Sequence, residues 1–190
     1  MCEQKIQIQK ITVKFLYNVR AVYSILLHAL NELNIASSKA TEQTQKDLGN
    51  FLNYCATNPE AQIIYRASDM QLEIEFDAAY LVTSKARSRA AGYHYLGNYD
   101  GKLFNGPIYV LAKVIKAVMS SAAEAESESL FLNAGEAVQY IKTLEELGHI
   151  HHPVRLRTDN NTALGIANKT IKVSKAKKWD MHDWWMIDRI

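Results

Sequence analysis

Residues 70–77, with the sequence MQLEIEFD, alternate between apolar and polar side chains. The apolar positions are Met70, Leu72, Ile74 and Phe76, and the polar positions are Gln71, Glu73, Glu75 and Asp77. This two-residue period predicts a β-strand, because successive side chains of a strand point to opposite faces of the sheet. By parity alone, Asp77 is the last residue of the polar strand face.

The chain after this strand predicts a mixed arrangement of strands and helices. The expected elements are strands near Tyr93–Leu96, Ile108–Ala112 and Val154–Thr158, a long helix from Ala122 to Leu147 that Gly148 ends, a short helix at Thr162–Asn168 and a last helix near Ala176–Ile190. Asp100-Gly101 is a turn signal inside the loop between the second and third strands. The first three strands are therefore expected to form an antiparallel meander in an α/β protein.

The chain before residue 61 has a different, helical pattern. Apolar side chains recur at steps of three and four from Phe15 to Leu33, which predicts one amphipathic helix over residues 11–34. A second helix carries Leu48 and Leu52 and ends at Asn58-Pro59. We therefore expect a helical hairpin in residues 1–60 and an α/β domain in residues 61–190.

Composition limits the class of protein. The chain has 190 residues, a net charge of +2 and only two cysteines, whose spacing suggests neither a zinc site nor a disulfide framework. The N-terminus lacks the uninterrupted apolar stretch of a signal peptide, and no apolar run approaches the roughly 20 residues that span a bilayer. These features predict an intracellular protein that does not span a membrane.

Glu126 is the acidic residue that the helical pattern singles out. Steps of three and four from Glu126 lead to Leu130 and on to Leu144, so Glu126 belongs to the apolar stripe that should face the sheet. Burying a lone carboxylate is costly unless a cation compensates its charge or it lies at the open end of the stripe. Glu124 has a different explanation, because Ser121 and Glu124 have the spacing of a capping box. Glu126 is therefore a candidate functional acid.

Two other acids occupy positions where secondary structure changes. Asp77 lies near the end of its predicted strand, and Asp159 follows the fourth strand just before a helix. Asp159 has an alternative role, since Asp is a common N-cap that contributes about 1 kcal/mol. Asn160 or Asn161 could cap that helix equally well, which would leave Asp159 available. Three distant acids that meet in one pocket could hold divalent metal ions against a phosphodiester.

Several short motifs, taken in chain order, resemble the ribonuclease H domain of copia-type LTR retrotransposon polyproteins. The matching stretches are Phe76-Asp77-Ala78-Ala79-Tyr80, Ala90-Ala91-Gly92-Tyr93, Gly106-Pro107-Ile108, Ser120–Glu126, Leu144–Gly148 and Thr158–Ala163. In the family, the second glutamate of the motif at 120–126 is a metal ligand, and this position is Glu126 here. The helical segment at 11–60 resembles the connection between reverse transcriptase and ribonuclease H.

The resemblance implies a ribonuclease H-like mixed sheet and a metal-dependent endonuclease. The expected activity is hydrolysis of the RNA strand of RNA–DNA hybrids with two Mg²⁺ ions, or Mn²⁺, held by Asp77, Glu126 and Asp159. The expected partners are the hybrid and the reverse transcriptase part of the same polyprotein, in the cytoplasm or a virus-like particle. The alternative is a catalytically impaired retroelement remnant that only binds nucleic acid or serves in assembly.

The C-terminal stretch departs from the family pattern. The family's last strand, and the helix that carries a fourth aspartate, have no counterpart before Ile190, so we expect a C-terminally truncated domain. Asp180 or Asp183 could replace the fourth acid, although no spacing supports either. A lysine cluster is the candidate phosphate-contacting segment. Its members are Lys169, Lys172, Lys175, Lys177 and Lys178.

Overall fold

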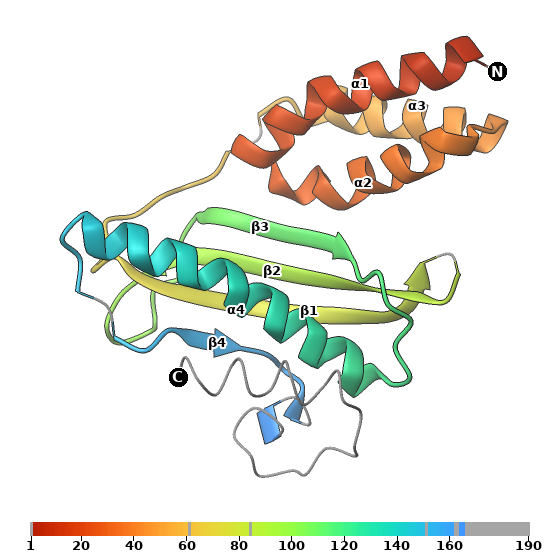
Figure 1. The fold of residues 1–190 in the computed structure, drawn as a ribbon. Helices are drawn as coiled ribbons and strands as arrows, with labels where there is room; N and C mark the ends of the chain where they lie inside the picture. Colours follow the sequence, from red (N-terminus) through yellow and green to blue (C-terminus); the bar gives the residue numbers. More distant parts are fainter. Residues whose placement is uncertain (1, 61, 84, 151, 162–163, 166–190) are drawn as a thin grey trace. The chain divides into compact units, whose positions relative to one another are not determined.

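The chain forms two compact units in a computed structural model, Met1–Ile64 and Tyr65–Ile190 (Figure 1). The structure describes residues 2–60, 62–83, 85–150, 152–161 and 164–165. The boundary between the units lies at Ile64, whereas the sequence pattern placed it at residue 60.

The first unit is helical. Its elements are α1 (Cys2–Ala21), the 3₁₀ turn η1 (Ser24–Leu26), α2 (Leu27–Ala36), the 3₁₀ turn η2 (Ser37–Lys39) and α3 (Glu42–Thr57). Thr41 begins α3 with a capping box in which its side chain and that of Thr44 each accept from the other residue's backbone N–H. Phe15 of α1 packs edge to face against Phe51 of α3, with ring centroids 5.2 Å apart.

The predicted single helix over residues 11–34 is wrong. The chain leaves the α-helical conformation after Ala21, and α2 begins at Leu27, so a bundle of three helices replaces the expected hairpin. The connecting residues include Val22, Tyr23 and Ile25, which are weaker helix formers than Leu or Ala. Val22 is 40% exposed and therefore leaves the predicted stripe, whereas Leu26, Leu30 and Leu33 are buried.

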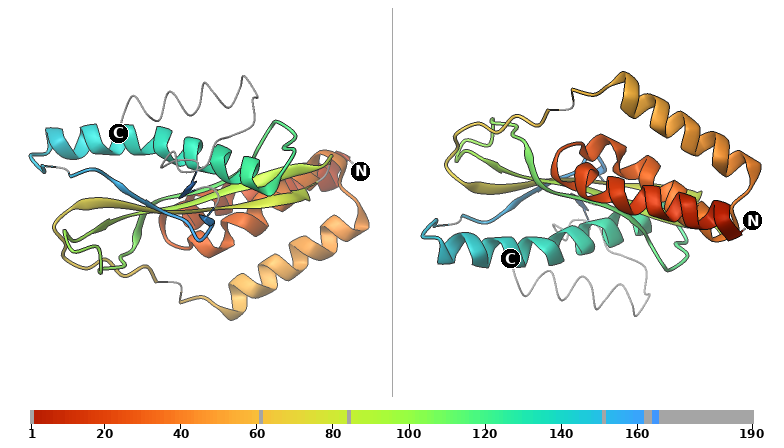
Figure 2. Two further views of the ribbon diagram at one scale, coloured as in Figure 1. Left: turned by 90° about the horizontal axis from the view of Figure 1, so that it is seen from below. Right: turned by 90° about the horizontal axis from the view of Figure 1, so that it is seen from above.

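The second unit contains a four-stranded mixed sheet covered on one face by a long helix (Figures 1 and 2). The elements are β1 (Gln71–Thr83), β2 (Arg87–Gly97), β3 (Pro107–Val114), α4 (Ala122–Glu146) and β4 (Arg155–Arg157). The strand order is β3-β2-β1-β4. Neighbours among β1, β2 and β3 are antiparallel, and β4 pairs with β1 in parallel. The predicted α/β class and antiparallel meander are confirmed.

The long helix begins and ends at residues that the sequence indicated. Ser121 is the N-cap, and its side chain accepts from the Glu124 backbone N–H at 3.1 Å. The Glu124 carboxylate turns back to Ser120, so it accepts from the Ser120 hydroxyl and backbone instead of completing the box with Ser121. At the other end Gly148 adopts a φ of 88°, a left-handed conformation that glycine tolerates without a steric penalty.

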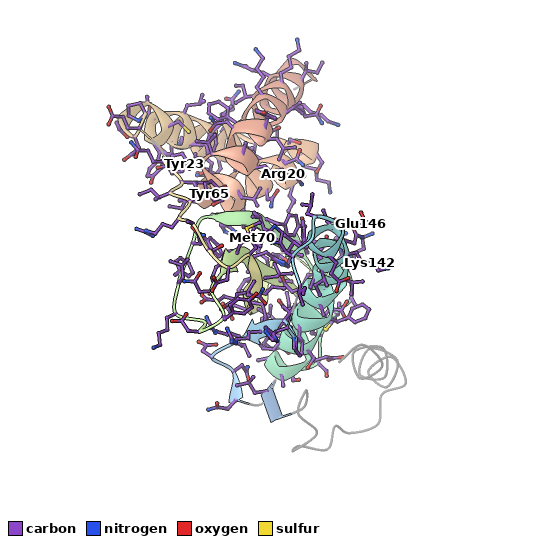
Figure 3. The ribbon with its side chains drawn as sticks, turned by 90° about the vertical axis from the view of Figure 1, so that its left-hand side faces the viewer. Arg20, Tyr23, Tyr65, Met70, Lys142 and Glu146 are labelled. Atoms are coloured by element: carbon purple, nitrogen blue, oxygen red, sulfur yellow. The ribbon has the colours of Figure 1, made fainter. Side chains whose placement is uncertain are left out.

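The core of this unit lies between α4 and the sheet. Leu72 and Ile74 of β1 pack with Ala137 and Leu144 of α4, and Met70, labelled in Figure 3, lies against this cluster. Phe76 packs with Leu130 closer to the start of α4. Leu72, Ile74 and Phe76 therefore face the helix, as the alternating pattern predicted, and this packing holds α4 against β1.

The opposite face of β1 is not an open polar surface at this end. Glu73 is 1% exposed and forms ion pairs with Arg155 at 3.1 Å and Arg157 at 2.7 Å, both from β4. The two arginines also donate to the carbonyls of Tyr99 and Gly101, in the loop between β2 and β3. Tyr95 donates to Glu73 at 3.3 Å, and burial raises the pKa of Tyr95 to about 12, with the Glu73 charge adding to this, so its hydroxyl keeps its proton.

Two further predicted helices fall largely or wholly outside the described residues. The predicted helix at 162–168 is described only at residues 164–165, where Leu164 donates from its backbone to the Asn160 carbonyl at 3.1 Å. The predicted helix near 176–190 lies outside the described residues. Within the described part of the chain, no helix combines the length and apolar character needed to cross a membrane.

Candidate functional site: an acid pair between β1 and α4

Asp77 lies in the second half of β1, beyond the part of that strand that pairs with β4. The described β1–β4 pairing covers Glu73 to Glu75. Asp77 is exposed, and its Oδ1 accepts from the backbone N–H of Ala78 at 2.7 Å. Its carbonyl accepts from the Ser129 hydroxyl of α4 at 2.8 Å. Asp77 is therefore held at the interface with the helix.

Glu126 lies in the second turn of α4 and is only 5% exposed. The predicted burial of this glutamate in the sheet-facing stripe is confirmed. Its neighbours on the same helix face are Ser129 and Leu130, both buried. Because Glu124 takes part in the helix cap, the two glutamates of this motif have separate roles.

The carboxyl group of Asp77 lies close enough to Glu126 to raise the pKa of that glutamate. Burial, and then the negative charge of Asp77, raises the pKa of Glu126 to about 7. Hydrogen bonds from the Ala78 backbone and the Asn160 side chain act in the opposite direction. One oxygen, Glu126 Oε2, is buried with no hydrogen-bond partner among the described residues. Glu126 Oε2 lacks a partner in this part of the chain, and the two carboxylates repel each other. A proton or a cation bound between them would therefore stabilise the site.

The third predicted acid is not part of this pair. Asp159 is exposed, and among the described residues no group of three or more His, Cys, Asp and Glu side chains lies close enough to hold a metal ion. Its neighbour Asn160 makes the contact to Glu126 instead. The backbone N–H of Asn160 donates to Thr158 Oγ1 at 3.1 Å, which turns the chain at the end of β4. The segment that follows β4 therefore contacts Glu126 through the side-chain amide of Asn160.

The remaining predicted site residues lie outside the described residues. They are Asp180, the substitute Asp183 and the lysines Lys169, Lys172, Lys175, Lys177 and Lys178.

Sequence reasoning missed a buried polar network beside the acid pair. It consists of Ser129 and Asn133 on α4 and His94 on β2, all with an exposed fraction of 0%. His94 Nε2 lies 2.8 Å from Asn133 Oδ1, and Asn133 Nδ2 donates to the carbonyls of Ala91 and Ser129 at 3.1 and 2.8 Å. Burial lowers the pKa of His94, so this ring is neutral at pH 7. Ser129 and Asn133 follow Glu126 at steps of three and four. This helical period could have indicated that both side chains lie on the same buried face as Glu126.

Replacing Gly92 with alanine is expected to break this network. A Cβ at Gly92 would lie 1.7 Å from Asn133 Oδ1 and 2.6 Å from its Cγ, so Asn133 would have to leave its hydrogen bonds. Overpacking of this kind costs about 1–3 kcal/mol. Urea unfolding of the two proteins measures the difference. Gly135→Ala is the matched control, because a Cβ there meets no atom within 4 Å; equal losses from both changes would contradict the expectation.

Comparison with known proteins supplies no relative for this site. The chain matches no protein-family model, no curated protein and no solved structure. Function must therefore be inferred from the residues and their geometry.

Proposed function

We propose that this chain is a retrotransposon-type ribonuclease H that hydrolyses the RNA strand of RNA–DNA hybrids with the help of divalent metal ions. The observation that carries the proposal is the buried Glu126 carboxylate held against Asp77 with one oxygen left unbonded. These two residues are the ones that the motif resemblance assigned as central metal ligands. An ordinary structural glutamate would be expected to find an arginine or lysine, as Glu73 does.

The arrangement of elements supports the same proposal. Three antiparallel strands are followed by a helix that covers the sheet and by a strand parallel to β1. This order agrees with the βββαβ part of a ribonuclease H-like domain. It brings the end of β4, the second half of β1 and the start of α4 to one region, where Asp77, Glu126 and Asn160 meet.

The donors at this region fit Mg²⁺ or Mn²⁺. Asp77 and Glu126 offer carboxylate oxygens, and Asn160 offers an amide, which are hard ligands of the kind Mg²⁺ prefers. Mg²⁺ is commonly held by one or two carboxylates together with substrate phosphate, so two acids suffice for one ion. When bound, such ions activate water and stabilise the charge that develops on the leaving oxygen. A second ion would need Asp159 to turn toward the pair.

The residues of the chain then have separate tasks. Asp77 and Glu126 would hold a metal ion, which would supply positive charge for the scissile phosphate. The Ala78 backbone N–H and the Asn160 side chain both favour the charged form of Glu126, so they offset part of the rise in its pKa. The lysines between 169 and 178 are proposed to contact the phosphates of the hybrid, whose 2′-hydroxyls mark the RNA strand. The reverse transcriptase part of the polyprotein is the proposed partner.

One observation favours the alternative of an impaired remnant. Within the described residues only two acids meet, and Asp159 stays exposed. A protein with this site could bind a hybrid in the cytoplasm or in a virus-like particle without cutting it.

A cleavage assay on a labelled RNA–DNA hybrid with Mg²⁺ or Mn²⁺ tests the proposal. The wild-type chain is expected to cut the RNA strand, and Glu126→Gln and Asp77→Asn are expected to abolish cutting, because each removes a charged ligand. Glu128→Gln is the matched control on the same helix, since Glu128 is more exposed than Glu126.

Three outcomes separate the possibilities. Cutting that is lost with Glu126→Gln and kept with Glu128→Gln supports the nuclease. Tight hybrid binding without cutting supports the remnant. Cutting that persists in Glu126→Gln contradicts the proposed role of the acid pair.

A further inference from the structure

We propose that Ser129 is a positioning residue that sets the separation of the two acids by tying α4 to the backbone of Asp77. This role rests on the proposed function, because it concerns the metal affinity of the Asp77–Glu126 pair. The Ser129 hydroxyl donates to backbone carbonyls, so it acts through the peptide that carries one of the two carboxylates.

The Ser129 hydroxyl lies where α4, β1 and β2 meet. It donates to the Asp77 carbonyl at 2.8 Å and lies 3.2 Å from the Ala91 carbonyl. Asp77 and Ala91 are paired residues in the β1–β2 register. Ser129 is also three residues after Glu126, one turn along the same face of α4. A single hydroxyl group therefore joins the helix that carries one acid to the strand that carries the other.

Apolar packing and the bond from Asn133 to the Ala91 carbonyl of β2 also hold α4 on the sheet, and the bond from Ser129 adds a tie to the Asp77 peptide itself. Close to Glu126, α4 meets the sheet through Ala125, which packs with Leu111, Ile115 and Met119. Apolar packing is non-directional, so it allows a helix to shift along a sheet at smaller cost than a hydrogen bond does. The bond from Ser129 to Asp77 is directional and partly buried. Its loss would leave the Asp77 carbonyl without this donor and remove this tie of the helix at the acid pair.

The polar network holds the Ser129 hydroxyl in the required direction. Asn133 Nδ2 donates to the Ser129 carbonyl at 2.8 Å and approaches Ser129 Oγ at 3.4 Å. Since that amide nitrogen is the donor, Asn133 Oδ1 accepts from His94 Nε2. The Ala91 carbonyl already accepts from Asn133, so the Asp77 carbonyl, at 2.8 Å, is the nearer acceptor for the Ser129 hydroxyl. The network thus runs from a neutral histidine on β2 to the backbone of the first acid.

The chain offers a closely matched control in Ser127. Ser127 is also a serine on α4, is 4% exposed, and adjoins Glu126. Its hydroxyl is buried with no hydrogen-bond partner among the described residues. Replacing each serine with alanine removes the same atom at the same depth, but only Ser129→Ala removes a bond to β1.

The test is the affinity of the full chain for Mn²⁺ alone, measured by electron paramagnetic resonance, together with urea unfolding of each variant. Ser129→Ala is expected to weaken Mn²⁺ binding about 10–100-fold, which is the usual effect of removing a group that orients a metal ligand. Ser127→Ala is expected to bind like the wild type, and Ser129→Thr, which keeps a hydroxyl, is expected to restore most of the affinity. Should Ser129→Ala not fold, Ser129→Cys takes its place, since a thiol is similar in size and a weaker donor.

The outcomes distinguish this role from the proposed function. If the wild type does not bind Mn²⁺, or if Glu126→Gln binds it equally well, the proposed metal site fails and the positioning role fails with it. If the wild type binds Mn²⁺ through Glu126 and Ser129→Ala binds it equally well, only the positioning role is overturned. A variant that loses stability but keeps its Mn²⁺ affinity shows that Ser129 is merely structural, which also overturns the proposal.

Discussion

Replacing both Arg155 and Arg157 with methionine is expected to lower the free energy of unfolding of the sheet unit by about 3–5 kcal/mol. The two arginines are the ion-pair partners of Glu73, whose side chain is 1% exposed. Their removal leaves the carboxylate buried with the Tyr95 hydroxyl as its neighbour. The cost of an uncompensated buried charge is far larger than the small contribution of a surface ion pair.

A third substitution separates the charge effect from the loss of packing. Adding Glu73→Leu to the double variant removes the buried, unpaired carboxylate, so much of the lost stability should return. Recovery should be incomplete, because both arginines also hold the loop at Tyr99 and Gly101. Urea unfolding, monitored by the hydrogen exchange of β1 peptides, measures the stability of the sheet unit in all three proteins. A triple variant that is less stable than the double variant would contradict the explanation.

The secondary structure of the sheet unit was predictable because its local signals agree with its packing. The alternation over residues 70–77 predicted β1, and the apolar even-numbered positions do face α4. The predicted start of the long helix at Ala122 matches the observed one, because Ser121 is an effective N-cap there. Where local chemistry specifies an element on its own, the sequence is sufficient.

The burial of Glu73 depends on distant parts of the chain. Glu73 lies on the polar side of β1 by parity, and it is covered by the arginines of β4, which also hold the loop at Tyr99–Gly101, and by Tyr95 of β2. The opposite charges of Glu73-Ile74-Glu75 and Arg155-Leu156-Arg157 were a signal for that pairing, since the two segments align residue by residue. In the first unit, the heptad-like stripe continues through Val22, and local pattern alone could not place the turn there.

The candidate site likewise has one residue that the local sequence pattern predicts and others that it does not. Glu126 was predictable because a carboxylate in an apolar stripe conflicts with helix packing. Asp159 and Asn160 are adjacent, and the choice between them depends on how the chain turns after β4, which Thr158 controls through its bond to the Asn160 backbone. Sequence order alone does not determine which of two neighbouring side chains reaches a site on another element.

Glu126→Gln is expected to stabilise the metal-free protein at pH 8 and to leave its stability at pH 5 nearly unchanged. The pKa of Glu126 is raised from 4.5 to about 7 in the folded state by burial and by Asp77. Between these two values the unfolded chain has released its proton while the folded chain has kept it, so stability is full below about pH 4.5 and falls as the pH rises through 7. The loss is at most about 3 kcal/mol. Glutamine is neutral throughout and avoids it.

The difference in unfolding free energy between wild type and Glu126→Gln, measured in urea from pH 5 to pH 8, isolates this group from other titrating residues. Asp77→Asn should reduce the wild-type slope only in part, because it removes the neighbouring charge but leaves the burial that is the larger cause. Mn²⁺ should reduce the slope further by pairing with the ionised carboxylate, and it should have no such effect on Glu126→Gln. Identical pH profiles for wild type and Glu126→Gln would mean that this glutamate is ionised in the fold at neutral pH, and the case for a cation at the acid pair would lose its electrostatic basis.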